Sequence, residues 1–239
     1  MNTINLNLKN LKELWTTVGK ERGLYFENHS LEGMYISEES WPNRVWLKDE
    51  GNHEHWQLAV EFLQANLGLT LSTFTDLGIA HHQVERTSKQ YGMAKPIERT
   101  SQASKVKLIR VTDESDANLW SSLFSIAFSY SISAKTVTAT SNLIEYYIAV
   151  HEGTPIGTVA LFASDTDVIG IHSMGVVPEH RGKGLAREIM FGLFDLSRNR
   201  PQNHFVLQAS EAGKPLYEKL GFKMEFIQNN YRLKATNHD

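Results

Sequence analysis

The segment from Ile169 to Arg200 constrains the fold of this chain more than any other. It begins with apolar and small residues up to Val177, continues through the turn Arg181–Ala186 (Arg-Gly-Lys-Gly-Leu-Ala), and ends in a stretch with apolar residues at helical spacing. This order predicts a strand buried on both faces, a turn and a helix. A helix N-terminus offers unpaired N–H groups and the positive end of the helix dipole, and glycines remove side-chain bulk there. The segment therefore predicts a phosphate-binding site.

Two common nucleotide-binding patterns do not fit this turn. A P-loop needs Gly-x-x-x-x-Gly-Lys followed by Ser or Thr, whereas Leu185 and Ala186 follow Gly184, so no hydroxyl is present to hold magnesium. A dinucleotide site needs a third glycine where the chain has Arg187. Both nucleotide patterns are excluded.

The turn instead resembles motif A of the GNAT superfamily of N-acetyltransferases. The signature Gln/Arg-x-x-Gly-x-Gly/Ala is met by Arg181, Gly184 and Ala186. A second stretch, Leu216–Phe222 (Leu-Tyr-Glu-Lys-Leu-Gly-Phe), is similar to the segment that follows the fifth strand in this family. The resemblance covers residues 105–235, and the two motifs lie at the separation that the family shows.

The resemblance implies an acetyl-CoA site on this segment. Backbone N–H groups of Gly182, Lys183, Gly184, Leu185 and Ala186 would hold the pyrophosphate, with the charges of Arg181 and Lys183 adding to them. Met174, Gly175, Val176 and Val177 would pair their backbone with pantetheine. Relatives often place an Asn seven residues before the motif tyrosine; here Ser210 stands at that position and can replace one of its hydrogen bonds.

The resemblance also implies the catalytic groups. Tyr217 stands where the family has its general acid, and a phenol is a plausible proton donor to a departing thiolate. Many relatives carry a Glu base at the position of Gly170, which has no side chain. His172 lies two residues further on, hence on the same strand face, and is a candidate base. A chain of water molecules without a single base is the alternative.

Composition narrows the class of protein. The chain has 239 residues, a net charge of −3 and no Cys. This charge predicts no nucleic-acid or membrane partner, and the absence of Cys excludes disulfides and a thiolate nucleophile. No N-terminal leader and no run of 18 apolar residues is found, so we expect a cytoplasmic protein. His53, His55, His81 and His82 lack a third ligand at a set spacing, so we expect no metal.

The remaining sequence predicts a second, smaller unit. The polar stretch Arg99–Lys105 is the expected boundary between a domain at 1–100 and a domain at 105–239. The first unit reads as helix 8–20, extended segments in 24–47, helix 55–66, strand 69–74, a helix from Thr75 or Asp76 to about Tyr91, and strand 93–97. It echoes the order of elements after 205 but lacks the phosphate motif, as in GNAT relatives with a degenerate first copy.

In the second unit the pattern predicts strands at 106–111, 146–150, 156–162, 169–177 and 205–208, helices from 112, 185–198 and 213–220, and a strand pair in 222–233. The fold expected is α/β with a mixed sheet, in a tandem GNAT-like arrangement with an intact C-terminal acyl-CoA N-acyltransferase domain. The turn Trp41–Trp46 is either a wall of the acceptor pocket or a hairpin packed on the core between the units.

These observations together predict transfer of acetyl from acetyl-CoA to a primary amine by direct attack in a ternary complex, with a small-molecule acceptor. Acetylation of a protein or peptide amine remains an alternative. A non-catalytic acyl-CoA sensor also remains open, because no carboxylate base stands at Gly170. The sequence leaves the oligomeric state open.

Overall fold

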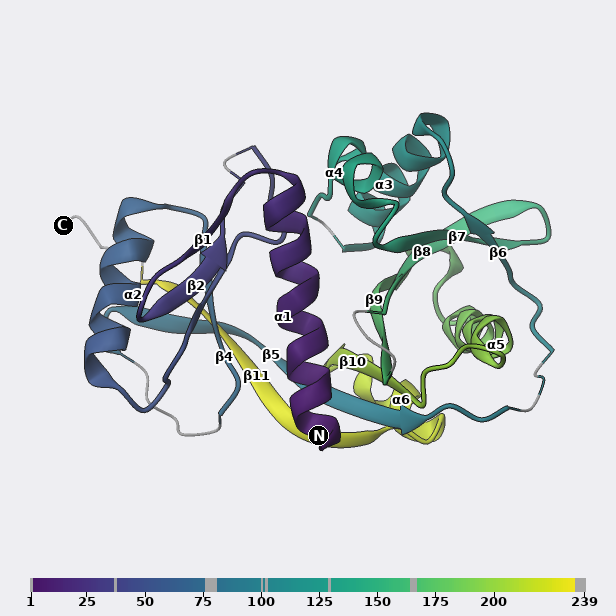
Figure 1. The fold of residues 1–239 in the computed structure, drawn as a ribbon. Coiled ribbons are helices and arrows are strands. Elements are labelled where there is room, and N and C mark those ends of the chain that lie inside the picture. Colours follow the sequence, from purple (N-terminus) through teal and green to yellow (C-terminus); the bar gives the residue numbers. More distant parts are fainter. Residues whose placement is uncertain are drawn as a thin grey trace.

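In the computed structural model, residues 2–36, 38–75, 81–99, 101, 103–128, 130–163 and 167–234 are described. Within them, eleven strands form one mixed sheet in the order β1-β2-β3-β4-β11-β5-β10-β9-β8-β7-β6 (Figure 1). The helices are α1 (Thr3–Glu21), α2 (His53–Ala65), α3 (Glu114–Phe128), α4 (Ala134–Thr140), α5 (Leu185–Ser197) and α6 (Lys214–Lys219). The strands are β1 (Tyr25–Glu27), β2 (Leu31–Met34), β3 (Arg44–Leu47), β4 (Thr70–Thr73), β5 (Val84–Pro96), β6 (Lys107–Arg110), β7 (Glu145–His151), β8 (Thr154–Phe162), β9 (Val168–Val176), β10 (His204–Ser210) and β11 (Lys223–Leu233).

Read outward from the centre of the sheet, the two sides have matching strand orders, except that β6 has no counterpart beyond β1 among the described residues. β5 and β11 pair antiparallel in the middle, β4 flanks β11, and β10 flanks β5, again antiparallel. On each side the next pair is parallel: β3 pairs with β4, which α2 connects, and β9 pairs with β10, which α5 connects. Each half of the chain therefore places one long strand, β5 or β11, beside a strand of the other half. This symmetry is the arrangement expected of two related copies, and the predicted fold class is confirmed.

The strand exchange bears on the predicted division at residue 100. β5 belongs to the first half in sequence but lies between β10 and β11 of the second half. One sheet thus runs through both predicted domains, and their independence stays a prediction.

The helix predicted to run to Tyr91 is wrong over its described part. Residues 84–96 form β5 instead, and residues 76–80 of that prediction lie outside the described residues. Gly92 does not end a helix; a Cβ there would lie 2.1 Å from the Phe226 ring, at a register shift between β5 and β11. Val84–Gln90 reads poorly as a strand because most of its side chains are exposed or polar.

Two further predictions differ from the structure. The strand pair expected at 222–233 is the single strand β11, which is long because it spans both halves. Between α3 and β7, where no helix was predicted, the structure has α4, whose N-cap Ser133 accepts a hydrogen bond from the N–H of Thr136. The other predicted helices and strands are found, with ends that differ by a few residues.

The helices enclose two main cores. α1, α3 and α4 share one cluster that includes Leu14, Trp15, Trp120 and Phe124, and α1 crosses the sheet between the two halves (Figure 1). α5 packs with alternate residues of β9 and β10 in a second cluster. Because neighbouring strand residues point to opposite faces, Ile171 joins the α5 cluster while His172 faces α1.

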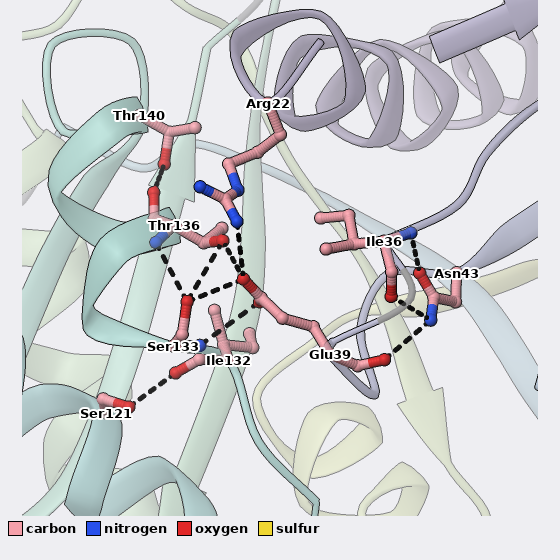
Figure 2. Close-up of polar contacts among 9 residues, drawn as sticks. All are labelled: Arg22, Ile36, Glu39, Asn43, Ser121, Ile132, Ser133, Thr136 and Thr140. Carbon is pink, nitrogen blue, oxygen red and sulfur yellow. Dashed lines mark hydrogen bonds and ion pairs between the residues drawn. The ribbon is translucent and has the colours of Figure 1, made fainter. Parts of the chain in front are cut away.

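A polar clamp holds the loop before β3 against α4 (Figure 2). The Glu39 carboxylate accepts hydrogen bonds from the hydroxyls of Ser133 and Thr136, both at 2.6 Å, and lies 3.4 Å from Arg22. Asn43 closes the same loop by bonding the backbone N–H and C=O of Ile36 at 2.7 and 2.9 Å. The clamp fixes the loop that leads into Arg44.

Candidate active site

β9 and β10 separate in the middle of the sheet. They pair only from Val168–Gly170 to His204–Val206, although β10 stays paired with β5 as far as Ser210. The gap leads into a cavity of 610 Å³ lined from both faces of the sheet. Ile171, Leu207 and Ala209 come from the α5 side, whereas His172 and Gln208 come from the α1 side. Two reactants could therefore meet in this gap from opposite faces.

A bulge in β9 shapes the wall of the gap. Thr158 pairs with Gly175 and Ala160 with His172, so β9 carries an extra residue, and Ser173 has a left-handed φ of 51°. Gly175 is needed here, because a Cβ would lie 2.5 Å from the Phe128 ring. The edge of Met174–Val176 that faces the gap has no strand partner among the described residues. An extended ligand could add there as a strand.

The glycine turn has the geometry of an anion site. Gly182 and Gly184 have φ of 74° and 76°, and Gly184 is the N-cap of α5. Among the described residues, no acceptor is bonded by the backbone N–H groups of 182–186. Leu185 is buried in the core and Ala186 lines the cavity, so the turn presents backbone rather than side chains. These residues fit the pyrophosphate predicted from the sequence.

Arg181 makes contacts that the sequence did not predict. Its Nε donates to the Val176 carbonyl at 2.9 Å and its Nη2 to the Ala127 carbonyl at 2.6 Å. The guanidinium thus ties the end of β9 to the end of α3, while Lys183 is exposed. Val177 is buried, and its N–H is bonded to Ile156. We assign Arg181 a positioning contact in addition to its charge.

Tyr217 lies on α6 with its hydroxyl toward β9. The hydroxyl donates to the sulfur of Met174 at 3.8 Å, which is a weak acceptor. Burial raises the pKa of Tyr217 well above its ordinary value, so the phenol keeps its proton at neutral pH. Ser210 stands nearby, where its Oγ accepts from the N–H of Gly213 and retains its own proton for donation.

His172 is paired with α1. Its Nε2 lies 3.0 Å from Oδ1 of Asn10, and the Asn10 amide nitrogen donates to the Phe162 carbonyl at 2.9 Å. Oδ1 must therefore accept, which makes Nε2 the protonated nitrogen of the neutral ring. Burial lowers the pKa of His172 to about 3. The imidazole is neutral near pH 7, but at this pKa it is a weak base.

Gly170 is required by that pair. A Cβ at position 170 would lie 2.0 Å from Oδ1 of Asn10 and 2.2 Å from Nε2 of His172. The space in which the resemblance led us to expect a Glu side chain is therefore filled by an imidazole and an amide.

The sequence analysis did not identify the polar residues that α1 contributes to this site. Asn7 and Asn10 are both fully buried, and Asn7 Oδ1 accepts from Gln208 at 2.7 Å. They lie on the same face of the helix as Leu11 and Leu14, and polar residues on an apolar face are the signal that could have identified them.

The Trp41–Trp46 segment, predicted either as a wall of the acceptor pocket or as a hairpin packed on the core, contributes Trp41 and Arg44 to the cavity lining.

The matching turn of the first half is unsuited to phosphate. It connects β3 to α2 through residues 48–52 and carries Asp49 and Glu50. The Glu50 carboxylate accepts from the backbone N–H groups of Phe74 and Thr75 at 2.7 and 3.0 Å. A carboxylate at this place repels phosphate, which agrees with a degenerate first copy.

Over the described part of the chain, no group of three or more His, Asp or Glu side chains could hold a metal ion. The same residues include no helix long and apolar enough to cross a membrane.

Comparison with known proteins agrees with the family resemblance found in the sequence. Residues 114–222 match the model of the acetyltransferase (GNAT) family. A glucosamine 6-phosphate N-acetyltransferase of Trypanosoma brucei brucei is 38% identical over 53 residues, which are 22% of this chain and 36% of that enzyme. The match thus spans about a third of that relative.

Solved structures extend the likeness over the whole fold. A GCN5-related N-acetyltransferase from Kribbella flavida superposes with a TM-score of 0.68 at 15% identity, covering 97% of this chain and 96% of that one. A tandem GNAT protein of the clavulanic acid biosynthesis pathway gives a TM-score of 0.52 at 15% identity, over 87% of this chain and 79% of that one. Residues 114–222 are thus similar to the GNAT acetyltransferase family, and the solved structures share the fold of the chain.

Proposed function

We propose that the protein transfers the acetyl group of acetyl-CoA to the amine of a small molecule. The observation that carries this proposal is the glycine turn opening α5, with its unbonded N–H groups, at one end of a gap that has the Tyr217 hydroxyl beside it. Acetyl-CoA, when bound there, supplies an acetyl thioester.

The residues of the gap support direct attack. The amine nitrogen would bond to the acetyl carbon as the carbon–sulfur bond breaks, and the departing thiolate would take the Tyr217 proton. The contact of this hydroxyl with the Met174 sulfur supports this role, because a sulfur atom already lies at its acceptor position. The amine loses its own proton to water, and water then returns the proton to Tyr217.

His172 has a smaller part in this proposal than the sequence predicted. A neutral imidazole with a pKa of about 3 can accept a hydrogen bond through Nδ1 and so orient an amine, but it removes a proton poorly near neutrality. We therefore favour the water route that the sequence left open, with the His172–Asn10 pair as a positioning device.

The apolar residues that line the cavity favour a small acceptor over a protein. On its α1 side the cavity is walled by Trp15, Trp41 and Leu14. The name of the trypanosomal relative, a glucosamine 6-phosphate N-acetyltransferase, also describes a small-molecule acceptor.

Release of coenzyme A from acetyl-CoA across a panel of amines tests the proposal. Tyr217→Phe should lower kcat by roughly 10²- to 10⁴-fold while leaving acetyl-CoA affinity unchanged, since the hydroxyl makes only a weak bond in the free protein. Tight acetyl-CoA binding without turnover of any amine would instead favour a sensor.

A further inference from the structure

A buried cation, Arg44, stands at the α1 side of the cavity. Its Nη1 donates to Oδ1 of Asn230 at 2.8 Å and to Oγ of Ser72 at 3.1 Å, and its guanidinium lies 5.3 Å from the centre of the Trp15 ring. Burial lowers the pKa of Arg44 to about 10, so the side chain stays charged at neutral pH. These contacts hold the guanidinium in one orientation.

The other edge of this guanidinium has no protein partner. Nε is buried without an acceptor, and over the described ranges Nη2 makes no hydrogen bond and no carboxylate forms an ion pair with Arg44. Nε and Nη2 form the edge with which arginine binds carboxylate or phosphate through two parallel hydrogen bonds. The unpaired edge belongs to a residue that lines the cavity.

The surroundings of Arg44 also favour an anion. The described residues that line the cavity include Arg44 and Arg181 but no Asp or Glu. Gln90 and Gln228 line it beside Arg44, and both belong to the hydrogen-bond network of Asn230. Gln228 is 1% exposed, and its Oε1 is buried without a donor. A ligand that accepts from Arg44 and donates to Gln228 would satisfy both unpaired atoms.

Resting on the proposed function, we propose that the acceptor amine carries an oxyanion, a carboxylate or a phosphate, bound by the Nε and Nη2 edge of Arg44, and a polar hydrogen bonded by Gln228. The phosphates of the cofactor are held elsewhere, at the turn 182–186 between β9 and α5. Arg44 comes from β3 in the first half, so this half supplies acceptor recognition while the second half supplies the cofactor site.

Paired acceptors test the inference. The carboxylate arm compares amino acids with their amides, and the phosphate arm compares an amino sugar phosphate with the free amino sugar. The wild-type protein should prefer the anionic member in one arm, which identifies the oxyanion. Arg44→Gln should lower kcat/KM for that member by roughly tenfold to a hundredfold, and the loss for the neutral member should be clearly smaller. Arg44→Lys, which keeps the charge without the paired edge, should fall between them.

Arg86→Gln is the matched control. Arg86 lies on β5, outside the cavity lining, and its substitution removes the same charge as Arg44→Gln. Equal wild-type use of both members in both arms, or equal losses for the two members in Arg44→Gln, would overturn the inference while leaving acetyl transfer intact.

If no amine is acetylated, the proposed function fails and binding decides the inference. With coenzyme A saturating the turn, inorganic phosphate or acetate should raise the Tm of the wild type and of Arg86→Gln but not of Arg44→Gln. The same shift in all three proteins would refute an anion site at Arg44. Should Arg44→Gln not fold, Arg44→Lys replaces it, and an undiminished anion preference would count against the inference.

Discussion

The His172 pair makes the protein acid-sensitive in a way that one substitution can isolate. Burial lowers the pKa of His172 to about 3 from an ordinary value of 6.5. Between pH 6.5 and about pH 3, His172 is therefore protonated in the unfolded chain but not in the folded protein. The free energy of unfolding should fall as the pH drops from 6.5 toward 3, with no contribution from this group above 6.5.

The size of the effect follows from the shift. Each pH unit between the two pKa values is worth about 1.4 kcal/mol, so at about pH 4.5 His172 should cost roughly 2 to 3 kcal/mol of stability. His172→Gln removes the titration and keeps a donor, because the Gln amide nitrogen can take the place of Nε2 opposite Asn10.

Urea unfolding at pH 7.5 and at pH 4.5 measures the difference. The wild type should lose about 2 to 3 kcal/mol more than His172→Gln between the two conditions. His151→Gln, which removes a histidine at the end of β7, serves as the control and should follow the wild type. If the wild type and His172→Gln lose stability in parallel, the ring titrates in the ordinary way, and a His172 base near neutrality becomes tenable again.

Three further predictions concern backbone and loop geometry. Gly184→Ala and Gly153→Ala both place a Cβ on a residue with left-handed φ, 76° and 79°, and no other atom lies within 4 Å of either Cβ. Each substitution should therefore lower the free energy of unfolding by about 1 to 2 kcal/mol. Calorimetry should find weaker acetyl-CoA binding for Gly184→Ala alone. Gly170→Ala should separate His172 from Asn10, since a Cβ there lies 2.2 Å from Nε2; we expect a loss of about 1 to 3 kcal/mol in thermal unfolding, and an unchanged Tm would contradict the packing described. Glu39→Ala breaks the clamp on the loop before Arg44, so the KM of the acceptor should rise while that of acetyl-CoA stays the same; equal increases in both would disprove this link.

The sequence was informative where a function depends on a short run of backbone. A left-handed φ at Gly182 and Gly184, the start of α5 and the stop at Gly221 are local requirements, and local residue patterns encode them. The same holds for the position of Tyr217 after β10. These elements could be predicted because each depends on neighbours within a few residues.

The contacts on the α1 side of the cavity could not be predicted from local sequence patterns. Asn10 and His172 are separated by 162 residues, and Arg44 and Asn230 by 186. Their contacts exist because α1 crosses both halves and because β5 and β11 are exchanged between them. The polar face of β5 hid its strand character, since side chains such as Ser88 and Gln90 serve the Asn230 network rather than an apolar core.

By itself, then, the sequence predicted the GNAT resemblance of the second half, the mixed α/β fold, and the glycine turn with the tyrosine that follows it. The tertiary structure alone decided that Gly170 makes room for His172 and Asn10, that the imidazole is neutral, and that Arg44 lines the cavity and has a buried Nε without an acceptor. The physical reason is that pKa values and unpaired donors depend on burial and on partners far away in the chain, which no local pattern records.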